Sequence, residues 1–137
     1  WPRKVYVCDT GLTRVTRYSE DIGKQMENIV FLELKKRENE KPLQQILYWK
    51  NSQGREVDFI VKEGPKITQL IQVTYATDPD EIDKREIKSL LKASKTLNCK
   101  NLTIITWDYK NSMRIRGLEI KFMPLWEWLL KQEYSNM

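Results

Sequence analysis

Apolar positions along the chain follow first a helical period and then a strand period. Between residues 20 and 37 they recur every three to four positions, which predicts an amphipathic helix that buries Met26, Val30 and Leu34. A charged stretch at 38–42 then predicts a surface loop. Upstream, the alternating residues 4–8 predict a short strand that ends at a turn.

Three strand-like runs follow the loop, at residues 45–50, 55–62 and 67–75. Turn-forming sequences separate them, and both contain glycine. Strands joined by such short turns run antiparallel, so this part of the chain is predicted to be a three-stranded meander.

Apolar positions recur at helical spacing again after residue 78, which predicts a second helix. Asp78 is suited to cap a helix that has Pro79 at its first position, and Asn98 is suited to end it. The run 101–107 is β-rich and almost continuously apolar, as expected of a strand buried on both faces. A strand, a helix and a strand at this spacing form a right-handed crossover, so 101–107 is predicted to lie parallel to 67–75.

Residues 118–122 are expected to add an edge strand, and residues 125–130 to begin a closing helix. The predicted fold class is therefore α/β, a sandwich around a mixed central sheet with an α-β-β-β-α-β core flanked by helices. We find no internal repeat and no linker, so residues 1–137 are expected to form a single domain.

The composition of the chain excludes several kinds of catalytic and binding site. The chain has no histidine, which excludes a Ser-His-Asp triad and a His-ligated zinc site. No glycine-rich phosphate loop is present, so this domain is not expected to bind a nucleotide itself. The sequence lacks a membrane-spanning run, and its two cysteines, Cys8 and Cys99, fit buried thiols in a reducing cytoplasm. A net charge of +5 suits an anionic partner such as DNA, or simply favours solubility.

Polar residues lie inside the predicted hydrophobic hairpin. If its turn is centred on Pro65, Asp58 faces Gln72 and Glu56 faces Thr74 on one side of the sheet. The opposite side is then apolar, carrying Val57, Phe59, Val61, Ile71, Val73 and Tyr75. Polar groups buried in a sheet are costly unless they are satisfied, so this cluster requires an explanation.

Glu27 borders the buried face of the first predicted helix. If it points toward Asp58, the two carboxylates form an oxygen-rich pocket of the kind that Mg²⁺ or Mn²⁺ selects. In the alternative interpretation, Glu27 pairs with a lysine at the helix boundary and Asp58 is an ordinary strand-edge acid. The pattern by itself leaves both open.

The run from Gly54 to Val61, followed by Leu70 to Tyr75, resembles the PD-(D/E)xK nuclease-like superfamily, whose fold is the restriction-endonuclease-like sandwich. More narrowly, residues 4–12 and 23–28 look like the C-terminal DUF4143-type domain of archaeal and bacterial AAA-type ATPases. The resemblance covers nearly the whole chain. It implies an ATPase module N-terminal to this domain, and the chain opens without Met, as a piece of a longer protein would.

The resemblance also implies roles for four residues. Glu27 and Asp58 would hold the divalent metal, and Gln72 would supply a further oxygen. Thr74 occupies the position of the lysine that orients the attacking water in active members. Such hydrolysis uses one or two divalent ions.

Two of these positions depart from the family pattern. Gln72 removes a negative charge from the metal site, and Thr74 cannot supply the missing cation. Losing one electrostatic stabiliser typically costs ~10²–10³ in rate. A relocated cation from Lys84, Arg85 or Lys88 is the alternative, so whether the protein is an enzyme stays open.

A basic stripe on the second predicted helix offers a separate route to DNA. Lys84, Lys88, Lys92 and Lys95 recur at helical spacing, Arg85 lies beside them and Lys100 extends the row. Such a row contacts phosphates without reading sequence, whereas the alternative is an ordinary solvated face.

The leading hypothesis from the sequence is a degenerate or inactive nuclease-like accessory domain of a AAA-type ATPase that binds DNA or a protein partner. The second hypothesis is an active Mg²⁺- or Mn²⁺-dependent DNase with a relocated lysine or arginine. The third is a protein-docking module that uses Trp126 and Trp128, if these side chains are exposed rather than packed.

Overall fold

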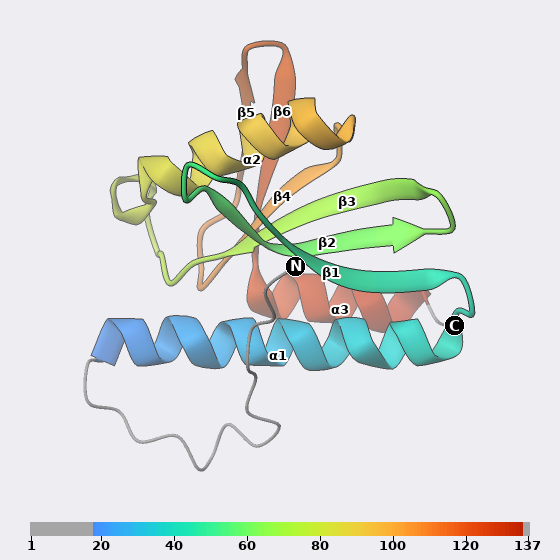
Figure 1. Cartoon of the computed structure of the whole chain (residues 1–137). Coiled ribbons are helices and arrows are strands. Elements are labelled where there is room, and N and C mark those ends of the chain that lie inside the picture. The colour runs from blue at the N-terminus through green and yellow to red at the C-terminus, as the bar shows by residue number, and fades with distance from the viewer. Residues whose placement is uncertain (1–17, 136–137) are drawn as a thin grey trace.

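Helices cover both faces of a six-stranded mixed sheet (Figure 1). The structure is a computed structural model that describes residues 18–135. Its elements, in chain order, are α1 (Tyr18–Glu40), β1 (Gln44–Lys50), β2 (Glu56–Glu63), β3 (Lys66–Val73), the 3₁₀ turn η2 (Pro79–Glu81), α2 (Lys84–Leu97), β4 (Leu102–Thr106), β5 (Asn111–Ile115), β6 (Leu118–Pro124) and α3 (Leu125–Ser135). The predicted α/β class and the α-β-β-β-α-β order are confirmed. The strand predicted at 4–8 and Cys8 lie outside the described residues.

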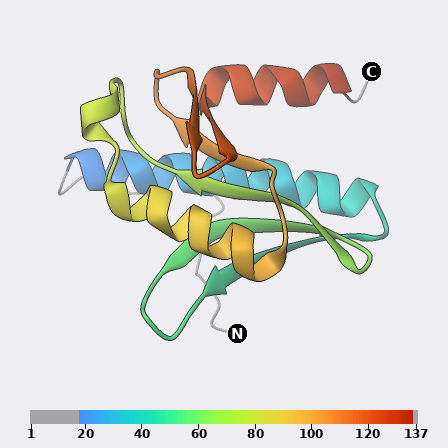
Figure 2. The same cartoon turned by 90° about the horizontal axis from the view of Figure 1, so that it is seen from above.

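Helices α1 and α3 lie below the sheet in Figure 1, and α2 lies above it. Met26, Val30 and Leu34 follow one another at a spacing of four and are buried against the lower face, as the helical period predicted. Seen from above in Figure 2, α2 runs across β2 and β3, which it contacts. The apolar residues of α2 form a second core with the upper face of the sheet. No helix in the described part of the chain is long and apolar enough to cross a membrane.

The β1–β2–β3 meander forms as predicted, with both pairs antiparallel. The predicted pairing of β2 with β3 holds at Phe59, Ile60 and Val61, which face Ile71, Leu70 and Gln69. It is wrong by one residue next to the turn, where Lys62 faces Ile67 and Glu63 faces Lys66, so the turn is not centred on Pro65 and an irregularity after Val61 restores the predicted register. On its other edge, where it pairs with β1, β2 carries a bulge. Ile60 pairs with Leu47 and Val57 pairs with Trp49, so two residues of β2 lie opposite one residue of β1 between these pairs.

The bulge makes one face assignment from the sequence wrong. Val57 was expected to point to the same side as Phe59, but it packs in the upper core with Ile60 and Leu70. The reason is that the extra residue shifts the strict alternation of side chains along β2.

The predicted start of the second helix also needs correction. Asp78 and Pro79 begin only the 3₁₀ turn, and Ile82 then returns to an extended conformation. A second cap, Asp83, accepts a hydrogen bond from the Arg85 N–H at 2.9 Å and starts α2. The predicted end is confirmed, since Asn98 adopts the left-handed conformation (φ 55°) that terminates helices.

The parallel pairing of β3 with β4 is confirmed, and every residue of β4 is buried. The strand predicted at 118–122 exists as β6, but it is not an edge strand. It lies between β4 and β5, and β5 forms the edge. The sequence analysis missed β5 because its residues are mostly polar and exposed, as is common at a sheet edge.

Candidate functional site

Asp58 and Gln72 lie side by side on β2 and β3. The Asp58 N–H donates a hydrogen bond to the Gln72 Oε1 at 2.9 Å, and the Val73 N–H donates to the Asp58 Oδ2 at 2.9 Å. The two side chains therefore complete hydrogen bonds between the strands beside the β2 bulge. The proximity expected from the hairpin register is present.

Gln72 is buried, with 3% of its surface exposed. Its Nε2 donates to the Glu56 carbonyl oxygen at 2.9 Å and to the Glu86 carbonyl oxygen at 3.4 Å. One carboxamide thus links β2, β3 and α2. Its oxygen, predicted from the resemblance to face a metal ion, accepts the main-chain N–H of Asp58.

A residue that the sequence analysis missed, Glu86, lies next to this pair. Burial, and after it the negative charges of Asp58, Asp83 and Glu27, raise the pKa of the Glu86 carboxyl to about 8, although a hydrogen bond with the Thr74 side chain acts in the opposite direction. Its Oε2 atom is buried without a hydrogen-bond partner. We call Glu27, Asp58 and Glu86 the carboxyl cluster.

The three residues of the carboxyl cluster come from both helical layers and from the sheet between them. Glu27 comes from α1 below the sheet, Glu86 comes from α2 above it, and Asp58 comes from β2 between them. A signal for Glu86 was present in the sequence, because it precedes Leu90 by four residues and Ala93 by seven, and so shares their buried face.

The protonation of Glu86 bears on metal binding by the carboxyl cluster. With a pKa of about 8, Glu86 is mostly protonated at pH 7, and it must lose this proton before it can act as a metal ligand. Thr74 bonds to Glu86 and brings no positive charge. Within residues 18–135 there is no group of three or more His, Cys, Asp or Glu residues that could hold a metal ion.

The cations suggested as replacements for the lysine lie elsewhere. Lys84 and Lys88 line a groove on the outer side of α2, and the Arg85 Nε pairs with the Asp83 Oδ2 at 3.4 Å. The charges that act on Glu86 are all negative.

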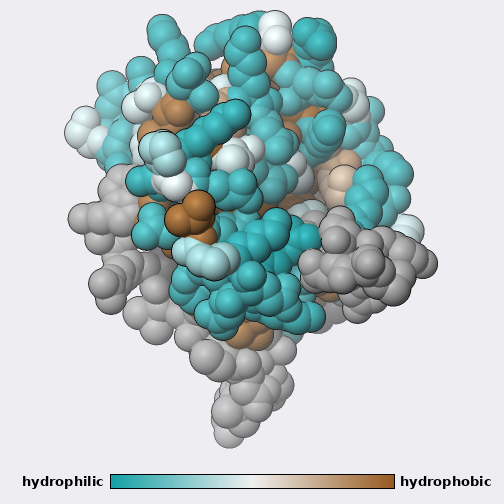
Figure 3. All heavy atoms as spheres, turned by 90° about the vertical axis from the view of Figure 1, so that its right-hand side faces the viewer, coloured by the Kyte–Doolittle hydropathy of each residue, from teal (hydrophilic) through white to brown (hydrophobic). Residues whose placement is uncertain are grey.

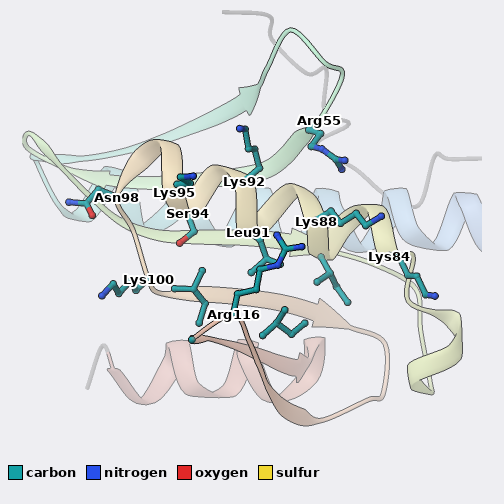
Figure 4. Close-up of a pocket in the computed structure, with 14 residues that line it drawn as sticks. Arg55, Lys84, Lys88, Leu91, Lys92, Ser94, Lys95, Asn98, Lys100 and Arg116 are labelled. Atoms are coloured by element: carbon teal, nitrogen blue, oxygen red, sulfur yellow. The ribbon is translucent and has the colours of Figure 1, made fainter.

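The groove runs between α2 and the β5–β6 hairpin and has a volume of about 1080 Å³ (Figure 4). Among the residues that the structure describes, its charged lining is entirely basic and includes no Asp or Glu. The cations are Arg55, Lys84, Lys88, Lys92, Lys95, Lys100 and Arg116. Its aliphatic lining consists of Ile87, Leu91, Ile115 and Leu118. We call this feature the basic groove.

The basic groove gathers four of the five cations predicted to bind DNA, together with Lys100. Arg85 is not part of its lining. Arg55 and Arg116 come from distant turns, and no periodic pattern in the sequence connects them with α2. Tertiary packing brings both to the groove, Arg116 from the tip of the β5–β6 hairpin and Arg55 from the connection between β1 and β2.

The two tryptophans of the docking hypothesis differ in environment. Trp128 is 3% exposed and packs in the lower core, so its proposed docking role is wrong. Trp126 is 56% exposed, and its Nε1 donates to the Asp108 Oδ1 at 3.5 Å. On the face shown in Figure 3, the hydrophobic side chains are scattered among hydrophilic ones.

Residues 22–128 match the model of a protein family described as a domain of unknown function, DUF4143. The chain belongs to this family. The DUF4143 domain is also 36% identical, over an alignment of 137 residues, to the "Uncharacterized protein MJ1544" of Methanocaldococcus jannaschii. That alignment covers 93% of this chain and 29% of the relative.

The fold of this DUF4143 domain is also similar to a chain in a solved assembly. The assembly is the half-complex from a tetradecameric assembly of Thermococcus gammatolerans McrB AAA+ hexamers with bound McrC. The TM-score is 0.50 at 13% sequence identity, over 76% of this chain and 28% of that chain. This likeness shows the fold alone. The chain spans less than a third of the length of both proteins.

Proposed function

We propose that this DUF4143 domain is an accessory domain of a AAA-type ATPase, that it binds DNA through the basic groove, and that its carboxyl cluster is a degenerate nuclease centre. The observation that carries this proposal is the composition of the groove, where seven cations and no acid share one lining. A groove with such a one-sided charge attracts a polyanion, and phosphates supply the largest part of non-specific DNA affinity.

The length of the basic groove fits a run of phosphates. From Lys84 to Lys95, α2 rises by about 17 Å at ~1.5 Å per residue. One DNA strand carries a phosphate about every 3.4 Å along the helix axis, so this row spans roughly five phosphates. The volume of about 1080 Å³ lies at the upper limit of pockets for small molecules, which favours a larger partner.

Three features of the carboxyl cluster support loss of catalysis. Thr74 replaces the family lysine, the neighbouring Glu86 is mostly protonated at pH 7, and the Gln72 oxygen already accepts the Asp58 N–H. The lost cation alone would slow hydrolysis by ~10²–10³. We therefore assign the cluster a structural role.

The link to an ATPase is supported by the solved chain with the similar fold, which comes from an assembly that contains AAA+ hexamers. The related M. jannaschii protein is much longer than this domain, so it has room for a further module. We propose that the DUF4143 domain works beside such a module, where ATP hydrolysis moves DNA that the basic groove holds.

The alternative function is a Mg²⁺- or Mn²⁺-dependent nuclease. The observation in its favour is the third carboxyl that Glu86 adds beside Asp58 and Glu27, which becomes a ligand for a divalent ion once the ion displaces its proton. A nuclease assay with Mn²⁺ on the wild type and on Asp58→Ala decides between the two. We expect no cutting above background in either protein. Metal-dependent cutting that Asp58→Ala abolishes would establish the nuclease instead.

DNA binding is tested with two double variants of equal charge change. Lys88→Glu with Lys92→Glu reverses two cations of the basic groove, and Lys36→Glu with Lys121→Glu reverses two exposed lysines outside it. We expect the groove variant to weaken DNA binding by at least about 100-fold at 0.1 M salt, and the control variant to change it by less than about threefold. Equal losses in both variants would refute the groove as the binding site.

A further inference from the structure

Arg116 occupies an unusual backbone position at the tip of the β5–β6 hairpin. Ile115 pairs with Leu118, so the loop has two residues, and both have positive φ angles, 52° at Arg116 and 79° at Gly117. This geometry matches a type I′ turn, whose first loop position is most favourable for Asn, Asp or Gly. An arginine there is strained, because its Cβ approaches the neighbouring carbonyl oxygen.

The strained residue lies at the basic groove. Arg116 is part of its lining, and in Figure 4 its side chain extends from the hairpin toward α2 and Leu91. The other hairpin arginine, Arg114, is exposed and is not part of the lining, and it donates to the Gly117 carbonyl oxygen at 3.4 Å. The hairpin therefore presents one cation opposite the lysine row of α2.

The uncharged lining of the groove bears on the form of DNA that it accepts. Within the described part of the chain, no Phe, Tyr or Trp lines the groove, and its apolar lining residues are aliphatic. Proteins that bind single strands in a basic groove generally stack the bases on aromatic side chains. A duplex keeps its bases stacked inside and offers its phosphates outside, so it needs cations but no aromatic platform.

We propose that the basic groove binds duplex DNA rather than single strands, and that its phosphates are held between the lysine row of α2 and Arg116. This inference rests on the proposed function and adds the form of the DNA and the role of the hairpin. Arg116 acts here as a phosphate-binding residue, and the strain at its position is retained for binding.

The test measures fluorescence anisotropy with a labelled 20-base-pair duplex of mixed sequence and with each of its single strands, at several salt concentrations. The variants are Arg116→Asn, which suits the turn but removes the cation, and Arg116→Lys, which keeps the charge. Arg114→Asn on the same hairpin is the matched control. Thermal unfolding is measured for all of them.

We expect the wild type to bind the duplex at least about fivefold more tightly than either strand. Arg116→Asn should weaken duplex binding about three- to tenfold and reduce the salt slope by about one, while Arg116→Lys and Arg114→Asn stay within about twofold. The unfolding temperature of Arg116→Asn should be equal to that of the wild type or higher by roughly 2–4 °C.

Two results would overturn the inference. One is tighter or equal binding of the single strands that still depends on Lys88 and Lys92, which would leave the DNA-binding function standing. The other is unchanged duplex binding in Arg116→Asn. Binding that is insensitive to Lys88 and Lys92 refutes the proposed function itself, so the two failures can be distinguished.

Discussion

Gln72 accepts a hydrogen bond from the main-chain N–H of Asp58 through its carboxamide oxygen, at 2.9 Å. The same carboxamide donates to the carbonyl oxygens of Glu56 and Glu86. This one side chain therefore joins two strands and a helix. Its amide group is suited to this task, because it both donates and accepts.

This relationship predicts that the change Gln72→Glu destabilises the fold. A carboxylate cannot donate to the two carbonyl oxygens, and it adds a buried negative charge beside Asp58. We expect the free energy of unfolding to fall by about 2–4 kcal/mol at pH 7 in urea titrations. The exposed Gln45→Glu is the matched control, with an expected change within ~0.5 kcal/mol. Equal stability of the two variants would contradict the bridging role of Gln72.

The protonated Glu86 makes stability depend on pH. The pKa of its carboxyl is about 8 in the folded protein against 4.5 for an ordinary glutamate, so the folded chain binds the extra proton between these values. The free energy of unfolding must then decrease as pH rises through this range. Glu86→Gln, which mimics the neutral carboxyl, should abolish this part of the decrease.

The measurement is urea unfolding at pH 5 and at pH 8.5. We expect the wild type to lose about 4 kcal/mol more than Glu86→Gln between the two values, since the shifted pKa acts over about three pH units and each unit corresponds to about 1.4 kcal/mol. Glu63→Gln, at an exposed position, should follow the wild type. Parallel profiles for Glu86→Gln and the wild type would show that Glu86 is ionised in the fold.

Substitution of the two tryptophans of α3 is expected to have very different effects on stability. Trp128→Ala opens a cavity in the lower core and should cost about 3–5 kcal/mol of stability. Trp126→Ala removes an exposed ring and should cost less than about 0.5–1 kcal/mol. Thermal or urea unfolding measures both. A large loss in Trp126→Ala would mean that its ring packs in the fold rather than remaining available to a partner.

Much of the fold could be predicted because its signals are local. The period of α1, the turns of the meander and the left-handed Asn98 each act within a few residues. What failed depended on contacts from outside the segment. Asp83 competes with Asp78 as the helix cap, and the β2 bulge, which moves Val57 to the other face, is visible only when β1 is paired.

The residues of the candidate site also divide into those that local sequence predicts and those that depend on tertiary packing. The proximity of Asp58 and Gln72 was predicted from the hairpin, although the register at its turn is one residue away from the predicted one, and the lysine row followed from the helical period. The missed residues required tertiary packing. Glu86 joins Asp58 only because α2 crosses above the sheet, and Arg116 reaches the groove only because the hairpin stands beside α2.

The measurement that tests the central claim most directly is the salt dependence of DNA affinity. If the basic groove holds the phosphates, the plot of log K against log salt should have a slope of about −4 to −6 in the wild type. The slope should become less steep by about two in the Lys88→Glu, Lys92→Glu variant and should stay unchanged in the Lys36→Glu, Lys121→Glu variant. An identical slope in all three proteins would contradict the account.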